Sequence, residues 1–66
     1  MAATQTPFFR VWNGDTGRFL QDFDLKTDAI AYAEGDPDDV VYYEVGFCVP
    51  TGDNEVEAVE ITEVYI

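Results

Sequence analysis

The sequence predicts one small α+β domain, residues 1–66, with the order strand, strand, helix, strand, strand. Four segments combine aromatic or β-branched residues with a period of two, which is typical of half-buried strands, and one segment between them changes to helical spacing. Short connections favour antiparallel pairing within the first pair and within the last pair of strands. We therefore expect two layers, an antiparallel sheet of three to five strands with one helix packed on one face.

The first two strands are expected at residues 8–12 and 18–23. The turn between them reads Asn-Gly-Asp-Thr-Gly, and these residues favour the positive-φ positions of hairpin turns. Alternation in the second strand places Phe19 and Phe23 on one face and Leu20 on the other. Residues 1–6 lack the basic and apolar regions of a signal peptide. We expect them to form a short flexible lead-in that ends at Pro7.

The helix is expected between Asp24 and Gly35, because apolar residues from Leu25 to Ala33 recur at helical spacing. Asp24 is a favourable N-cap, and Gly35 is well placed to end the helix in a left-handed conformation. Pro37 prevents continuation.

The third strand is expected at residues 40–50, which alternate most clearly. One face carries Val41, Tyr43, Val45, Phe47 and Val49, and the other carries Val40, Tyr42, Glu44, Gly46 and Cys48. A glycine inside a strand indicates a bulge or a close approach of another group to the backbone, so we expect one of these at Gly46.

The last strand, residues 55–66, does not alternate cleanly, because strict alternation leaves glutamates on both faces. A bulge near Ala58 and Val59 sorts the strand into two sides. Glu55, Glu57, Glu60 and Thr62 then face outward, and Val56, Val59 and Ile61 face inward. We favour this register because it buries no unpaired carboxylate, which would be costly.

The charge balance is the most unusual property, since 14 acidic residues face three basic ones and the net charge is −11. Nucleic-acid binding requires lysines and arginines at phosphates, so we expect no direct nucleic-acid binding, and an anionic membrane is disfavoured for the same reason. A basic protein surface is the natural electrostatic partner. A single cysteine permits no internal disulfide, which suits a cytoplasmic protein.

The chain offers no recognisable catalytic or metal motif. It has no histidine, and Cys48 has no basic neighbour in sequence that would lower its pKa. The loop with Asp36, Asp38 and Asp39 lacks the ligand spacing of a calcium-binding EF-hand. We therefore expect a protein that is not an enzyme and that uses neither metal nor cofactor.

Ten aromatic side chains exceed what one helix can cover. We expect Trp12, Tyr42 and Tyr65 on the open face of the sheet or around its edge. Exposed Trp and Tyr are enriched among residues that dominate the energy of protein–protein contacts, so these three are candidate partner-binding residues.

The acidic residues are the main candidate site. Residues two apart on a strand are about 6.6–6.8 Å apart, of the same order as successive phosphates on a nucleic-acid strand. The proposed row comprises Glu55, Glu57, Glu60 and Glu63, extended by Glu44, Asp36, Asp38 and Asp39. A solvated face that keeps an edge strand from aggregating is the alternative. However, solubility is served by a net charge of about 2–8, less than this chain carries.

Four features of the chain are its small size, its row of glutamates, its Asp-Pro-Asp-Asp loop and its lack of catalytic motifs. In these features it resembles the small acidic phage inhibitors that mimic DNA, namely the anti-CRISPR and anti-restriction proteins. The resemblance implies that carboxylates replace phosphates in a basic groove of a DNA-binding effector complex. For an anti-CRISPR protein, this groove would engage target DNA or its short PAM, which basic side chains read. The location would then be the cytoplasm of the host cell.

A metal-binding or enzymatic domain stays an alternative, and two other functions also remain open at this point. An acidic antitoxin that neutralises a basic toxin would have the same electrostatics. The second is a structural module that dimerises through its last strand, because an exposed apolar strand edge favours pairing. We expect a monomer or a weak homodimer.

Overall fold

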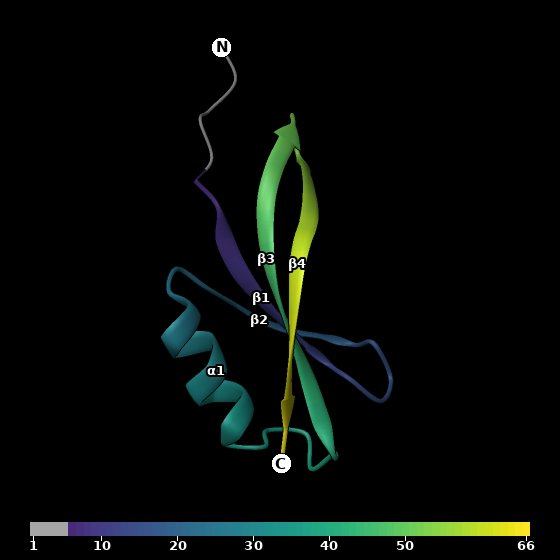
Figure 1. The fold of residues 1–66 in the computed structure, drawn as a ribbon. Coiled ribbons are helices and arrows are strands. Elements are labelled where there is room, and N and C mark those ends of the chain that lie inside the picture. The colour runs from purple at the N-terminus through teal and green to yellow at the C-terminus, as the bar shows by residue number, and fades with distance from the viewer. Residues whose placement is uncertain (1–5) are drawn as a thin grey trace.

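A computed structural model describes residues 6–66, and these form one antiparallel sheet with one helix on one face (Figure 1). The elements are β1 (Phe8–Asn13), β2 (Phe19–Phe23), α1 (Lys26–Glu34), β3 (Tyr42–Gly52) and β4 (Glu55–Tyr65). The strand order in the sheet is β2-β1-β3-β4, and all neighbours are antiparallel. The predicted α+β class and element order are confirmed. Of the predicted lead-in, residues 1–5 lie outside the described part and Thr6 is exposed.

The core lies between α1 and one face of the sheet, which we call the helix face; the opposite side is the open face. Cross-strand partners share a face, so the pairs Val11–Val45 and Tyr43–Val64 bring four buried side chains together. The helix adds two small residues, Ala29 and Ala33, which are fully buried. Small helix residues let α1 lie close to the sheet. No helix in residues 6–66 has the length and apolarity required to cross a bilayer.

Both predicted ends of the helix need correction. Leu25, not Asp24, is the N-cap; it is extended and makes no side-chain cap bond, and its carbonyl accepts from Ala29 at 3.2 Å. At the other end Gly35 remains right-handed with φ −74°, and Asp36 takes the left-handed position with φ 55°. Asp tolerates this conformation because its short side chain can bond locally, here by accepting from the Val40 amide at 3.0 Å.

A bulge changes the faces of β2. Val11 pairs with Gln21 and Trp12 with Phe19, so Leu20 has no cross-strand partner. Leu20 packs against the core together with Phe23, whereas Phe19 is 51% exposed. The expectation that Phe19 and Phe23 share a face is wrong, because the extra residue shifts the alternation between them.

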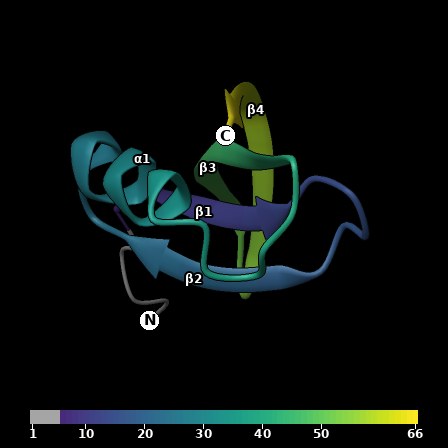
Figure 2. The same cartoon turned by 90° about the horizontal axis from the view of Figure 1, so that it is seen from below.

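The hairpin of β3 and β4 is much longer than the helix that packs on it. Eleven residues per strand span about 36 Å, whereas the nine helical residues span about 14 Å. The sheet is also strongly twisted, so β4 and β2 cross at a wide angle (Figure 2). The hairpin turn therefore lies far from α1 (Figure 1), and residues 51–61 are all exposed.

Candidate functional site

The bulge expected near Ala58 and Val59 is present in β4. Phe47 pairs with Glu60 and Cys48 with Ala58, which leaves Val59 without a partner. Since a bulge inserts one extra residue, the residues on its two sides change their alternation relative to one another. This bulge places Glu57 and Glu60, which are three residues apart, on the same face, and a second irregularity lies between Pro50 and Gly52 near the hairpin turn.

Three of the predicted glutamates lie together on the helix face. Glu60 is opposite Phe47 and Glu57 is opposite Val49, and these two partners follow Val45 at a period of two. Glu55 pairs with Gly52 beyond a second irregularity and lies two residues before Glu57 on the same strand. All three are exposed, because this part of the hairpin extends beyond α1. We call Glu55, Glu57 and Glu60 the acidic row. Glu60 is the end of the acidic row nearest to α1, and Lys26 at the start of α1 has its Nζ 4.0 Å from Glu60 Oε1.

Glu63 does not belong to this row. It lies on the open face directly opposite Glu44, and its Oε1 accepts a hydrogen bond from the Tyr65 hydroxyl at 3.0 Å. That bond, followed by the Glu63 charge, raises the pKa of Tyr65. The eight predicted acidic residues are therefore not one continuous patch. Glu44 and Glu63 form a separate pair on the opposite side of the sheet.

The apolar side chains of β4 are exposed rather than inward. Val56 and Ile61 lie on the open face with 37% and 46% of their surface accessible, and Val59, at the bulge, is 53% exposed. The predicted separation from the glutamates is correct for Val56 and Ile61, but their predicted burial is wrong. The physical reason is that the helix packs on the other face, so no second layer covers them.

The open face carries the three aromatic residues proposed as partner-binding. Trp12 lies over Gly46, where an added Cβ would be 2.8 Å from Trp12 Cη2 and 3.1 Å from Ile61 Cδ1. Of the two expectations for Gly46, the close approach is therefore the one observed. Tyr42 and Tyr65 pair across the strands and stack with ring centroids 5.2 Å apart. Tyr65 is the most accessible of the three at 67%.

A second part of the open face was not anticipated. The Arg10 guanidinium lies 5.0 Å from the centroid of Phe8 and 5.1 Å from that of Phe19. Its Nε donates to Asp22 Oδ1 at 2.7 Å, and this bond raises the pKa of Arg10. Alternation of Phe8, Arg10 and Trp12 along β1 is the sequence signal that could have placed them together.

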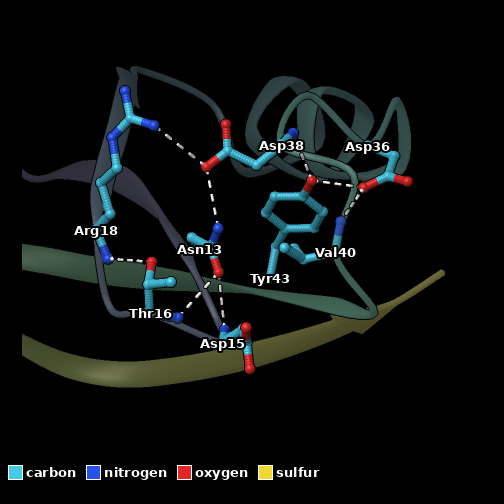
Figure 3. Close-up of polar contacts among 8 residues, drawn as sticks. All are labelled: Asn13, Asp15, Thr16, Arg18, Asp36, Asp38, Val40 and Tyr43. Atoms are coloured by element: carbon cyan, nitrogen blue, oxygen red, sulfur yellow. Dashed lines mark hydrogen bonds and ion pairs between the residues drawn. The ribbon is translucent and has the colours of Figure 1, made fainter.

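The acidic loop after α1 is largely used by the fold itself (Figure 3). Asp36 Oδ1 accepts from the Tyr43 hydroxyl at 2.5 Å and from the Val40 amide at 3.0 Å. The same hydroxyl accepts from the Asp38 amide at 2.7 Å. Burial, followed by the bond to Asp36, raises the pKa of Tyr43. Tyr43 thus fixes the loop from within the core.

Asn13 connects this loop to the β1–β2 turn (Figure 3). Its Nδ2 donates to Asp38 Oδ2 at 3.0 Å, and its Oδ1 accepts from the amides of Asp15 and Thr16. Arg18 Nη1 also lies 3.6 Å from Asp38 Oδ2. Asp36 and Asp38 are therefore structural acceptors, whereas Asp39 is exposed with φ 56°. Sequence reasoning missed Asn13, since a turn asparagine gives no sign of its distant partner.

Most carboxylates of the chain have no basic neighbour. Each of the three basic residues has a carboxylate within 4.0 Å: Arg10 with Asp22, Arg18 with Asp38 and Lys26 with Glu60. The other eleven carboxylates have no basic side chain that close. Glu55 and Glu57 are among them and lie on the most exposed part of the fold.

Cys48 is buried, and burial raises the pKa of its thiol, so the reactive thiolate is disfavoured at neutral pH. Within residues 6–66, no three potential metal-ligating side chains of the His, Cys, Asp or Glu type are grouped together.

Comparisons with protein-family models, with curated proteins and with solved structures find no significant match to this chain. Two surfaces then bear on function. One is the acidic row on the part of the hairpin beyond α1. The other is the open face, where apolar and aromatic side chains surround the pair Glu44 and Glu63.

Proposed function

We propose that this protein is a non-enzymatic inhibitor that binds a basic protein surface by imitating nucleic-acid phosphates. The target is a nucleic-acid-binding effector, most specifically a CRISPR complex whose target-DNA or PAM site is blocked. The observation that carries this proposal is the acidic row, in which three carboxylates lie on one face of an exposed, extended hairpin. Electrostatic complementarity of this kind favours fast association and selects basic partners.

The geometry supports a rigid display of charge. Carboxylates on a paired strand are held at fixed positions, whereas those on a flexible tail would spread over many positions. The pairing of β4 with β3, in which Val59 alone of the strand's eleven residues lacks a partner, supplies that extended backbone. Among residues 6–66, only Glu60, at one end of the row, has a basic neighbour, so the other two charges are available to a partner.

The proposed contact residues differ in part from those expected from sequence. Glu55, Glu57 and Glu60 form the centre, and exposed Asp39 is a peripheral candidate. Glu44 and Glu63, with Trp12, Tyr42 and Tyr65, form a second contact on the open face. Asp36 and Asp38 are left out, because their carboxylates accept hydrogen bonds inside the protein.

The test compares two triple variants with the same change in charge. One removes the acidic row (Glu55→Gln, Glu57→Gln and Glu60→Gln). The control removes three exposed carboxylates around the helix (Asp24→Asn, Asp28→Asn and Glu34→Gln), far from the hairpin turn. Binding of labelled target DNA to purified CRISPR effector complexes is measured with each protein present, over a series of salt concentrations.

We expect the wild type and the control to prevent DNA binding by an effector, with inhibition that weakens as salt rises. The acidic-row variant should lose inhibition. Equal inhibition by both triple variants would contradict the role of the row, and inhibition insensitive to salt would contradict charge mimicry. The same variants tested against restriction enzymes and basic toxins distinguish the other acidic-inhibitor functions.

A further inference from the structure

In the part of the chain that the structure describes, the outer edge of β4 has no pairing partner, and the outward direction of its backbone groups is defined. β4 is the last strand in the order β2-β1-β3-β4. The Ile66 amide donates to the Val41 carbonyl at 2.9 Å, one position beyond the pair of Tyr42 and Tyr65. Because hydrogen-bonded and non-hydrogen-bonded pairs alternate in an antiparallel ladder, Thr62 and Val64 bond to β3. The backbone groups of Ile61, Glu63 and Tyr65 therefore point outward, away from β3.

The side chains along this edge are sorted by chemistry. From Glu55 to Ile61 the helix-face side carries the acidic row, and the open-face side carries Val56, Ala58 and Ile61. Toward the end of β4, Thr62 and Val64 follow on the helix face, and Glu63 and Tyr65 follow on the open face. Natural edge strands are protected by charged side chains, especially lysine, by proline or by a bulge. β4 contains neither lysine nor proline, and its charges are all negative, so they repel an acidic strand but attract a basic one. Its bulge at Val59 leaves residues 60–65 as a continuous paired arm. The edge is thus a template for a further strand.

A second copy of this chain is a poor occupant. Each copy carries a net charge of −11, and β4 itself contains four glutamates and no basic residue. Like charges on adjoining strands are destabilising. The edge instead matches an extended segment that alternates basic and apolar residues, with basic side chains on the helix-face side and apolar side chains on the open-face side.

We infer that the outer edge of β4 binds an extended basic segment of its partner as a fifth, antiparallel strand. The basic side chains meet the acidic row, and the apolar side chains lie beside Ile61 on the open face. Main-chain hydrogen bonds to the outward groups of Ile61, Glu63 and Tyr65 hold the segment, as in other cases of strand addition. This inference rests on the proposed function and specifies the form of the basic surface.

The probe is a synthetic Lys-Val repeat of about ten residues, the length of a long strand, with acetylated and amidated ends. Its composition control has the lysines and valines in pairs, which keeps the charge and destroys the alternation. Two further peptides carry backbone N-methyl groups, one on the valines and one on the lysines. In antiparallel addition, the valines lie opposite Ile61, Glu63 and Tyr65 and share the open face with them. Because the backbone groups of these three residues point outward, the valine amides point at β4, whereas the lysine amides point away from it.

Binding is followed by the fluorescence of Trp12, the single tryptophan, which contacts the Ile61 side of the open face. We expect the alternating peptide to bind about tenfold more tightly than the paired control, and methylation of the valines to weaken it about tenfold, since two or three hydrogen bonds are lost. Methylation of the lysines should have little effect. Exchange of the Ile61, Glu63 and Tyr65 amides should slow on binding, with Thr62 and Val64 as references that are protected throughout.

Equal binding of the alternating and paired peptides, or outward amides that exchange as fast with peptide as without it, would overturn the strand-addition inference. Suppose that the wild type binds the two peptides equally and that the acidic-row variant binds neither. Recognition of charge by the acidic row is then supported, and only the addition of the peptide as a strand is contradicted. No binding of any peptide would also overturn the inference, whereas the proposed function is judged separately by the DNA-competition experiment.

Discussion

Glu44 and Glu63 lie directly opposite each other on β3 and β4, on the open face of the sheet. Like charges in this position are destabilising, because side chains of a non-hydrogen-bonded pair are close together. The Tyr65 hydroxyl supports one of them by donating to Glu63. Two carboxylates beside aromatic side chains are thus held at a cost in stability, which fits a role in contacting a basic partner.

Glu44→Gln is therefore expected to stabilise the isolated protein by about 0.2–1 kcal/mol. Urea unfolding at low salt measures the change, and Glu57→Gln, whose cross-strand neighbour is Val49, is the matched control. Added salt should reduce the difference, since it screens the repulsion between the two carboxylates. A destabilised Glu44→Gln protein would show that Glu44 makes a favourable interaction instead.

Gly46→Ala should displace Trp12 from the open face. An added Cβ would be 2.8 Å from Trp12 Cη2, so the ring must move. We expect a red-shifted tryptophan emission and a loss of about 1–3 kcal/mol in the free energy of unfolding, which is typical of overpacking. In the Trp12→Leu background the same substitution should be nearly neutral, and the double-mutant cycle isolates the contact. An unchanged emission maximum in Gly46→Ala would contradict the packing of Trp12 on Gly46.

Tyr43→Phe should lower the free energy of unfolding by about 1–3 kcal/mol at neutral pH, because the Asp38 amide and Asp36 lose a buried partner. Its pH dependence should also change. The pKa of Tyr43 is raised above its ordinary value of 10.0, so the stability from its protonated form is fully present below that pH. This stability is lost as pH rises through the folded-state pKa.

Urea unfolding between neutral pH and pH values above 10 measures this effect. The wild type should lose stability more steeply than Tyr43→Phe. Both are compared in the Tyr65→Phe background, because the pKa of exposed Tyr65 is raised as well. Parallel profiles for the two proteins would show that Tyr43 does not carry the alkaline loss.

Asn13→Asp should destabilise the protein by about 1–3 kcal/mol although its shape is preserved. The substitution replaces the donor to Asp38 by a second carboxylate, 3.0 Å away in the present geometry. The acceptor for the Asp15 and Thr16 amides is retained, so the turn itself keeps its bonds. Asn13→Asp in an Asp38→Asn background should recover much of the loss. Failure of this pair to recover would contradict the link between the turn and the loop after α1.

Much of the fold could be predicted because it depends on local patterns. Alternation located all four strands, and the conflict between alternation and buried charge located the bulge in β4. The bulge at Leu20 was missed, since either face of β2 looked acceptable without knowledge of its register. The helix ends were missed because Asp24 and Gly35 have the right chemistry for caps, but the chain enters the helix at Leu25 and turns at Asp36.

The site could be predicted only in part. Charge and alternation brought Glu55, Glu57 and Glu60 together. The same alternation places Glu63, three residues after Glu60, on the other face, so its inclusion in the row rested on charge alone. Asp36 and Asp38 looked available because their partners, Tyr43 and Asn13, come from other parts of the sequence or from the core. The exposure of Ile61 also depends on a tertiary fact, namely that the helix packs on the opposite face of the sheet and no second layer covers the open face.

That short helix has a consequence for how the protein can change over generations. The acidic row is exposed and lies outside the buried cluster that includes Ala29 and Ala33. Under the proposed function, substitutions in this row alter partner choice while the folding of the core is preserved, because exposed positions away from special features change stability little. A lineage under pressure from a diversifying target could thus rewrite its contact surface one residue at a time and keep the same scaffold.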